Sequence, residues 1–135
     1  MLGELLGEAS GKVTGVRVLP TEGEQVRVEV SFQGQGKILG LEIGDLGTYW
    51  QTTRRGGELF GEGHVLMMTK DGGVADWEGF GVGKRTGPPP AAHYAVCGYY
   101  ASAPEKLARL LGVSNVIEYE VDQNGNYHWK MWEWK

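Results

Sequence analysis

The chain reads GQGKIL at residues 34–39, ahead of Trp50, and then GEGHVL at residues 61–66, ahead of Trp77. Every matched position recurs 27 residues later. Each copy joins a Gly-x-Gly entry and apolar residues to a turn, which is Gly44-Asp45 in the first copy and residues 71–73 in the second. A repeat of strand, turn and strand at this length predicts a β-hairpin used more than once. The sequence therefore predicts an antiparallel sheet.

Two further hairpins flank the repeat. Residues 13–19 and 25–32 form the first, with turn residues over 20–24, and valines alternate with polar residues from Gln25 to Phe32. Residues 116–121 and 127–134 form the last, joined by Asn124-Gly125, a strong signal for a type I′ turn. With those two residues at the centre of the turn, Val121 faces His128, Tyr119 faces Lys130 and Ile117 faces Trp132.

The remaining segments connect or cover these strands. Leu2, Leu5 and Leu6 are spaced for one amphipathic turn that packs on the rest of the fold. Glycines at 79, 81 and 83 leave a stripe without side chains, across which Trp50 or a tyrosine of the next strand could lie. Residues 87–90 are a proline-rich connector at a rim, and residues 92–101 are an aromatic strand. Residues 103–111 predict a helix with a capping box from Ser102 and Glu105, and this helix covers apolar surface or an open barrel end.

About eight strands with one short helix predict an all-β, antiparallel up-and-down barrel. A sheet of this many strands would otherwise leave two edges unpaired. The 23 glycines, against roughly nine or ten at average usage, suit a small and strongly coiled barrel. A β-sandwich is the alternative. We expect residues 1–135 to form a single domain.

Several motifs resemble one known group of proteins. They are GEG at 61–63 with TKDGG at 69–73, WEGFGVG at 77–83, and VIEYEVD at 116–122 with WEW at 132–134. The pattern is similar to the small bacterial barrels of the calycin superfamily, near the lipocalin-like and allene oxide cyclase-like domains of unknown function. The resemblance spans roughly residues 10–135 and implies a calycin-like barrel whose interior can hold a small apolar molecule. No cyclase active-site motif matches position by position, so the resemblance transfers no catalytic residue.

Composition narrows the possible partners. The net charge is −4 and no basic cluster is present, which argues against nucleic acid and anionic membranes as partners. A single cysteine, Cys97, suits a reducing compartment, and the chain start lacks a signal-peptide pattern. We therefore expect a soluble, unprocessed cytoplasmic protein with no membrane partner.

The candidate site residues combine ionisable groups with aromatic walls. Glu62 and His64 share one face of a strand, where a carboxylate could orient an imidazole. Cys97 is a small buried hydrophobe or a nucleophile, and Lys130 suits a cation over aromatic rings or a lysine at the rim. Aromatic residues would form rigid pocket walls. The candidate ligand-binding residues are Trp50, Glu62, His64, Trp77, Cys97, Tyr99, Tyr119, His128, Lys130 and Trp132.

No cofactor or metal is predicted, because the three histidines, His64, His93 and His128, lie on separate strands without ligand spacing. The first hypothesis is a non-enzymatic barrel that binds a small apolar ligand and forms a homo-oligomer through an exposed aromatic or glycine-rich face. The second is an isomerase or cyclase, which needs a buried ionisable group from Glu62, His64, Cys97 or His128. The third is a ligand-free oligomeric interaction module. The sequence leaves open the ligand, the oligomeric state and which aromatic residues face inward.

Overall fold

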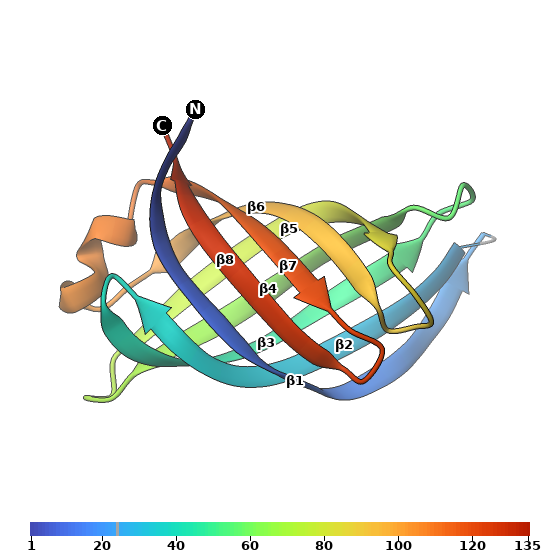
Figure 1. Ribbon diagram of the computed structural model, residues 1–135, viewed down its shortest axis with the longest axis horizontal. Coiled ribbons are helices and arrows are strands. Elements are labelled where there is room, and N and C mark those ends of the chain that lie inside the picture. The colour runs from blue at the N-terminus through green and yellow to red at the C-terminus, as the bar shows by residue number, and fades with distance from the viewer. Residues whose placement is uncertain (24) are drawn as a thin grey trace.

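The computed structural model of the protein describes residues 1–23 and 25–135. Eight antiparallel strands join in chain order and close into a barrel, because β1 pairs with both β2 and β8 (Figure 1). The elements are β1 (Leu2–Glu22), β2 (Gln25–Ile38), β3 (Leu41–Thr53), β4 (Leu59–Thr69), β5 (Val74–Arg85), β6 (Ala92–Ser102), the 3₁₀ helix η1 (Glu105–Leu110), β7 (Ser114–Val121) and β8 (Asn126–Trp134). The predicted up-and-down barrel with one short helix is confirmed, and the sandwich is excluded. Glu24, part of the predicted turn over 20–24, lies outside the described residues.

The amino-terminal segment is a strand and not the predicted amphipathic turn. Leu2 pairs with Trp134 and Leu5 with Trp132, so these residues form one side of the barrel seam. Two register irregularities, between Leu2 and Leu5 and between Leu5 and Gly7, turn Leu6 into the core. The apolar spacing that resembled one helical face therefore comes from a bulged strand.

The first turn of the 27-residue repeat lies elsewhere than predicted. Gly44 and Asp45 sit within β3, and the reversal is at Leu39-Gly40, both with positive φ (51° and 80°). Two consecutive left-handed residues form the kind of turn that matches strand twist. The Leu39 amide also donates to the Leu6 carbonyl at 2.8 Å, which helps to hold the non-glycine residue in this conformation. The two copies therefore differ in structure: Trp77 faces the core, whereas Trp50 lies on the outer side of β3.

The predicted helix is present but shorter and of another type. Its N-cap is Pro104 and no side chain caps it, so the capping box from Ser102 and Glu105 is wrong. A 3₁₀ helix has three residues per turn, so Leu107 and Leu110 fall on one side, and both are buried. Leu111, which α-helical spacing would also bury, is 41% exposed. The two buried leucines join the core at the end of the barrel where η1 lies (Figure 1).

The last hairpin has a three-residue turn and not the predicted two-residue one. The Asp122 amide donates to the Asn126 carbonyl, and Gly125 adopts a positive φ of 83°. The Asp122 carboxylate also accepts the amides of Asn124 and Asn126 at 2.8 and 2.9 Å. The pairing is thereby shifted by one residue, so Val121 faces Tyr127, not His128. A shift of one residue exchanges the faces of a whole strand.

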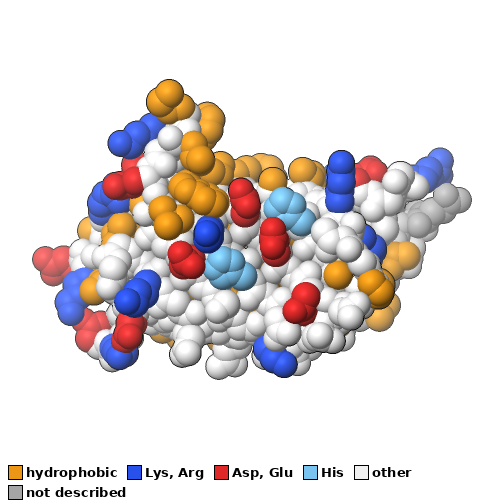
Figure 2. Space-filling model, viewed as in Figure 1, with side chains coloured by type: hydrophobic (Ala, Val, Ile, Leu, Met, Phe, Trp, Pro, Cys, Tyr) orange, Lys and Arg blue, Asp and Glu red, His pale blue; other side chains and the backbone are white. Residues whose placement is uncertain are grey.

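The corrected register places the charged residues of this hairpin outside. Tyr119 faces Trp129 and Ile117 faces Met131, all buried, whereas the predicted partners Lys130 and Trp132 lie on the outer side of β8. Figure 2 shows acidic, basic and histidine side chains together on this outer face. Within residues 1–23 and 25–135, no helix has the length and apolar character needed to cross a bilayer.

Candidate functional site

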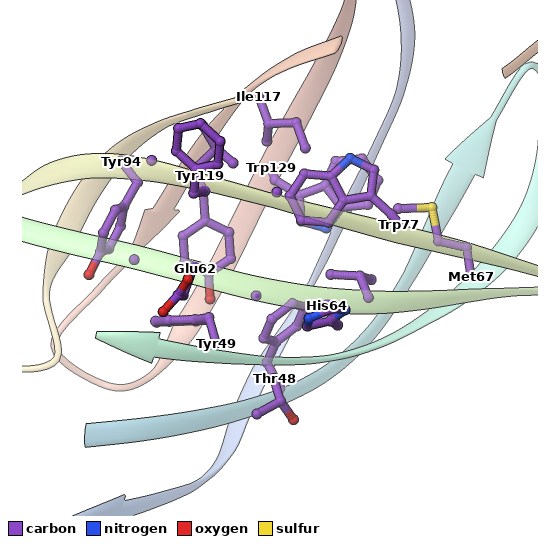
Figure 3. A pocket seen from close by; sticks show the side chains of 18 residues that line it. Thr48, Tyr49, Glu62, His64, Met67, Trp77, Tyr94, Ile117, Tyr119 and Trp129 are labelled. Carbon is purple, nitrogen blue, oxygen red and sulfur yellow. The ribbon is translucent and has the colours of Figure 1, made fainter. Parts of the chain in front are cut away.

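The interior of the barrel contains a cavity of about 70 Å³ beside β4 and β5 (Figure 3). Inward-facing glycines create space there, because Gly61 pairs with Gly81 and Gly63 with Gly79 across the two strands. The opposite walls are aromatic and aliphatic. The inward-facing residues around the cavity include Phe32, Tyr49, Val65, Met67, Trp77, Tyr94, Val96, Ile117, Tyr119 and Trp129.

Aromatic rings fix the shape of the cavity. Tyr119 lies 5.7 Å from Tyr49 and 5.8 Å from Phe32 between ring centroids, and it stacks on Tyr127 at 5.6 Å. The predicted role of a tyrosine over the glycine stripe is confirmed: a Cβ on Gly83 would lie 2.7 Å from the Tyr94 ring. These rings have few rotatable bonds, so the cavity walls are preorganised.

The Tyr119 side chain lines the cavity, and its buried hydroxyl has no partner of ordinary hydrogen-bond geometry in the described parts of the chain; the Tyr49 hydroxyl is its polar neighbour. Burial raises the pKa of Tyr119 well above its ordinary value, and the neighbouring Tyr49 hydroxyl raises it further. Burial also raises the pKa of Tyr49 to about 12. Both phenols therefore stay protonated near neutral pH, so Tyr119 keeps a proton that it can direct toward the Tyr49 hydroxyl or toward an acceptor in the cavity.

The other buried donors of the interior have partners, although one carboxylate oxygen of Asp45 has none among the described residues. The Trp77 indole donates to Asn115 at 3.0 Å, and the Tyr94 hydroxyl donates to Gln51 at 2.6 Å. One carboxylate oxygen of Asp45 accepts from the Tyr127 hydroxyl at 2.8 Å and from the Trp129 indole at 3.1 Å. Burial raises the pKa of Asp45, while these two donors oppose the rise. The unpaired Tyr119 donor thus contrasts with the paired groups around it.

The structure places two of the ten predicted site residues inside the barrel. Trp77 and Tyr119 are buried and line the cavity. The other eight lie on the outer side of their strands, half-buried or exposed, and are Trp50, Glu62, His64, Cys97, Tyr99, His128, Lys130 and Trp132. Glu62 and His64 also border the cavity, in the strand that forms its wall, but their exposed side chains alternate outward (Figure 3). Whether any of the ten residues binds a ligand stays a prediction.

The outer ionisable residues pair with their strand neighbours. The His64 Nδ1 atom lies 3.5 Å from a carboxylate oxygen of Glu78 on the neighbouring strand β5. The strand spacing had instead indicated Glu62 as its partner. His128 lies 3.2 Å from Glu8 of β1. Cys97 is exposed, with its thiol 3.7 Å from the Phe80 carbonyl. Since Glu62, His64, Cys97 and His128 all face solvent, none of them supplies the buried ionisable group on which the isomerase or cyclase hypothesis depended.

Sequence reasoning missed three important interior residues: Asp45, Tyr49 and Trp129. The sequence predicts Asp45 in a turn, and the predicted two-residue turn of the last hairpin puts Trp129 on the side of the ribbon opposite Tyr119. Strict alternation along β3 would have found Tyr49, because Asp45, Gly47, Tyr49 and Gln51 share one face and Asp45 and Gln51 are buried.

One group of residues on the outer surface offers metal-ligand atoms. His93, Glu118 and Glu120 are exposed, and their ligand atoms lie within 4.8 Å of one another. Imidazole nitrogen and carboxylate oxygen are ligands that zinc accepts. His128 pairs with Glu120 from the other side, on β8. The group is separate from the cavity, which it does not line.

Solved structures share this fold at low sequence identity. A conserved protein of unknown function from Rhodopseudomonas palustris is similar with a TM-score of 0.81 and 15% identity, over 98% of this chain and 97% of that one. A β-barrel-like protein from Acinetobacter baumannii has a TM-score of 0.82 and 16% identity, over 100% and 96%. An enzyme from Penicillium herquei has a TM-score of 0.65 and 16% identity, over 96% and 92%. No protein-family model matches the chain, and no curated protein matches its sequence.

The fold and the comparisons together define the class of the protein. It is a small eight-stranded β-barrel protein, similar to bacterial barrel proteins of unknown function. The resemblance to such barrels that the sequence motifs indicated is confirmed. At these identities the likeness concerns the fold alone, so function has to be argued from the cavity.

Proposed function

We propose that the protein binds one small, mostly apolar molecule in the barrel cavity, and that this molecule accepts a hydrogen bond from Tyr119. The observation that carries the proposal is that Tyr119 lines the cavity and its buried hydroxyl has no partner of ordinary hydrogen-bond geometry among the described residues. An unpaired buried hydroxyl costs about 1–3 kcal/mol. A ligand carbonyl or ether oxygen would recover part of that cost.

The size of the cavity limits the ligand. A buried water needs about 10–15 Å³ and a cavity of about 150 Å³ holds benzene. A cavity of about 70 Å³ therefore suits a molecule of roughly three or four non-hydrogen atoms. Its walls are mostly apolar, and the exposed side chains of Glu62 and His64 alternate outward, which favours a neutral molecule over an ion. A small ketone, aldehyde or ether meets these requirements.

No catalytic step is proposed, because the cavity walls hold tyrosines that stay protonated near neutral pH. Asp45 is the buried carboxyl group of the described interior, but it accepts from Tyr127 and Trp129 and does not line the cavity. Binding is thus better supported than acid or base chemistry. The cytoplasmic location, and the exclusion of nucleic acid and membranes as partners, stay predictions from composition.

The test compares two probes of the same shape, acetone and 2-methylpropane, in which the carbonyl oxygen of the first stands where the second has a methyl group. Binding is followed by NMR through the indole N–H signals of Trp77 and Trp129, which line the cavity. We expect both probes to shift these signals and the ketone to bind about tenfold more tightly, the factor that corresponds to one hydrogen bond of about 1.4 kcal/mol. The Tyr119→Phe variant should lose that preference and keep the affinity for the hydrocarbon.

The control is Tyr100→Phe, which also removes a buried hydroxyl. The Tyr100 hydroxyl contacts the Met67 sulfur at 3.0 Å and does not border the cavity, so the probe preference should stay unchanged. If neither probe shifts the indole signals, the cavity does not accept molecules of this size. If Tyr119→Phe keeps the ketone preference, another group recognises the ligand. Native mass spectrometry of protein purified from its own kind of cell would then identify any retained molecule.

A further inference from the structure

An apolar stripe crosses four neighbouring strands on the outside of the barrel. Phe80 of β5 pairs with Cys97 of β6, Cys97 with Val116 of β7, and Val116 with Trp132 of β8. All four side chains lie on the outer side of their strands. The solvent-facing side of an antiparallel sheet normally carries polar residues. We call these four residues the outer apolar stripe.

The outer apolar stripe lies in an open groove of about 540 Å³. Further apolar residues widen the groove, among them Phe60 and Val82, and Phe80 and Val82 are 57% and 54% exposed. Leu2, at 55% exposure, extends the groove toward the seam between β1 and β8. Figure 2 shows hydrophobic side chains gathered over the ends of β1 and β8 and along the neighbouring rim of the molecule. Contiguous exposed apolar surface of this kind marks interaction sites.

The groove is lined by one basic and one acidic side chain, which come from different parts of the chain. Arg54, just beyond β3, lies over the Phe60 ring at 4.8 Å, and Glu118 is on β7. Both side chains are exposed and both line the groove. A two-fold axis through the groove, midway between them, would bring Arg54 of each protomer opposite Glu118 of the other. The groove is therefore complementary in charge to a second copy of itself.

We infer that the outer apolar stripe is the interface of a homodimer, in which two barrels pack face to face and the Arg54 and Glu118 side chains pair across a two-fold axis. Packing of two sheets through their faces is a common way to bury such surfaces. The side chains are of the types that dominate binding energy at interfaces, since an aromatic residue lies at each end of the stripe and an arginine lies beside it. This inference does not depend on the cavity ligand.

The test is sedimentation velocity of the purified chain from about 1 to about 500 μM, since standard-size interfaces have dissociation constants of micromolar or below. We expect a dimer. Phe80→Glu should weaken dimerisation at least 100-fold, because it places a charge on each side of the interface. The control is Val18→Glu, since Val18 is 78% exposed on β1 and does not line the groove, and this variant should stay dimeric.

Exchanging the charges of Arg54 and Glu118 distinguishes a homodimer from a complex with any other partner. Arg54→Glu and Glu118→Arg should each weaken the dimer about tenfold, since each places like charges opposite one another. The double variant should restore the affinity of the unmodified chain, and circular dichroism should show the same fold for all variants. A monomer throughout the concentration range would overturn the inference. So would a double variant that dimerises no better than the two single ones.

Discussion

Asp45 is a carboxyl group held inside an aromatic core, and it ties β3 to β8 across the barrel through Tyr127 and Trp129. Among the described residues it is the one charged side chain that is completely buried. Removing an acceptor from two buried donors costs about 1–3 kcal/mol for each donor. Asp45 therefore stabilises the fold mainly by accepting these two hydrogen bonds, and less through its own negative charge.

Two substitutions of Asp45 should behave differently. Asp45→Asn keeps an acceptor oxygen for Tyr127 and Trp129 and should change the free energy of unfolding by about 1 kcal/mol or less. Asp45→Leu leaves both donors unpaired and should lower it by about 2–5 kcal/mol. Urea denaturation measures both values. Equal losses in the two variants would show that packing, and not the acceptor oxygen, gives the residue its effect.

The raised pKa of Asp45 also predicts how the free energy of unfolding changes with pH. Burial raises its pKa in the folded state, so the folded chain binds this proton more tightly than the unfolded chain. Its carboxyl therefore lowers the free energy of unfolding as pH rises from the unfolded pKa through the folded one. Asp45→Asn lacks the titrating group, so the protein should lose stability relative to this variant over that interval. The opposite slope would mean that Tyr127 and Trp129 stabilise the carboxylate more than burial destabilises it.

Two glycines of the cavity wall should respond differently to alanine. A Cβ on Gly81 would lie 2.3 Å from the Ala95 carbonyl oxygen, a backbone atom that cannot easily move. A Cβ on Gly61 would lie 3.3 Å from a ring carbon of Tyr94, with the next atoms at 3.9 Å. We expect Gly81→Ala to lower the free energy of unfolding by about 2–4 kcal/mol, and Gly61→Ala to change it by about 1 kcal/mol or less. Thermal unfolding of the two variants distinguishes these outcomes.

At the scale of elements, the β7–β8 hairpin shows where sequence reasoning reaches its limit. The Asn124-Gly125 pair located the turn correctly, but Asp122 accepts two amides and adds a third residue to the loop. That local hydrogen bonding decided which face of β8 is inside. The strands could be predicted from alternation, whereas the site depended on the register of each pair, which a single turn residue can shift.

The same hairpin gives a prediction for Gly125, whose φ is 83°. Gly125→Ala should lower the free energy of unfolding by about 1–2 kcal/mol, because an L side chain is strained in the left-handed region. Gly125→Asn should cost less, since asparagine tolerates that region better. Urea denaturation of both variants, with Asn124→Ala as a neighbouring control, measures the difference. An equal loss in all three would contradict the assigned turn.

For the whole molecule, the number of strands, their antiparallel order and their closure were predictable, because hairpin signals recur along the chain and an open sheet would leave two edges. The cavity could not be predicted, because its walls are side chains from strands that are far apart in the sequence. Tyr49 of β3 and Tyr119 of β7 approach each other across the interior, and no local pattern records that approach.

The strands should differ in hydrogen exchange. The β1–β8 seam has two register irregularities between Leu2 and Gly7, whereas β4 pairs without interruption on both sides. Irregular pairing at a strand end opens at lower free energy than a continuous ladder. We expect seam amides of residues 2–7 to exchange much faster than those of β4, measured by NMR in deuterated buffer. Comparable protection would show that the barrel opens only as a unit.

Closure of the seam has a consequence for how the chain folds. Seven of the eight pairings join strands that follow one another in sequence, while the eighth joins Leu2–Lys12 to residues 126–134. Contacts between the two ends of a chain carry the largest loop-closure cost and form late. Until they form, the sheet has two unpaired edges, and each edge can pair with that of another molecule. Refolding yield should therefore fall as protein concentration rises, and exchange of strands between molecules is the expected competing product.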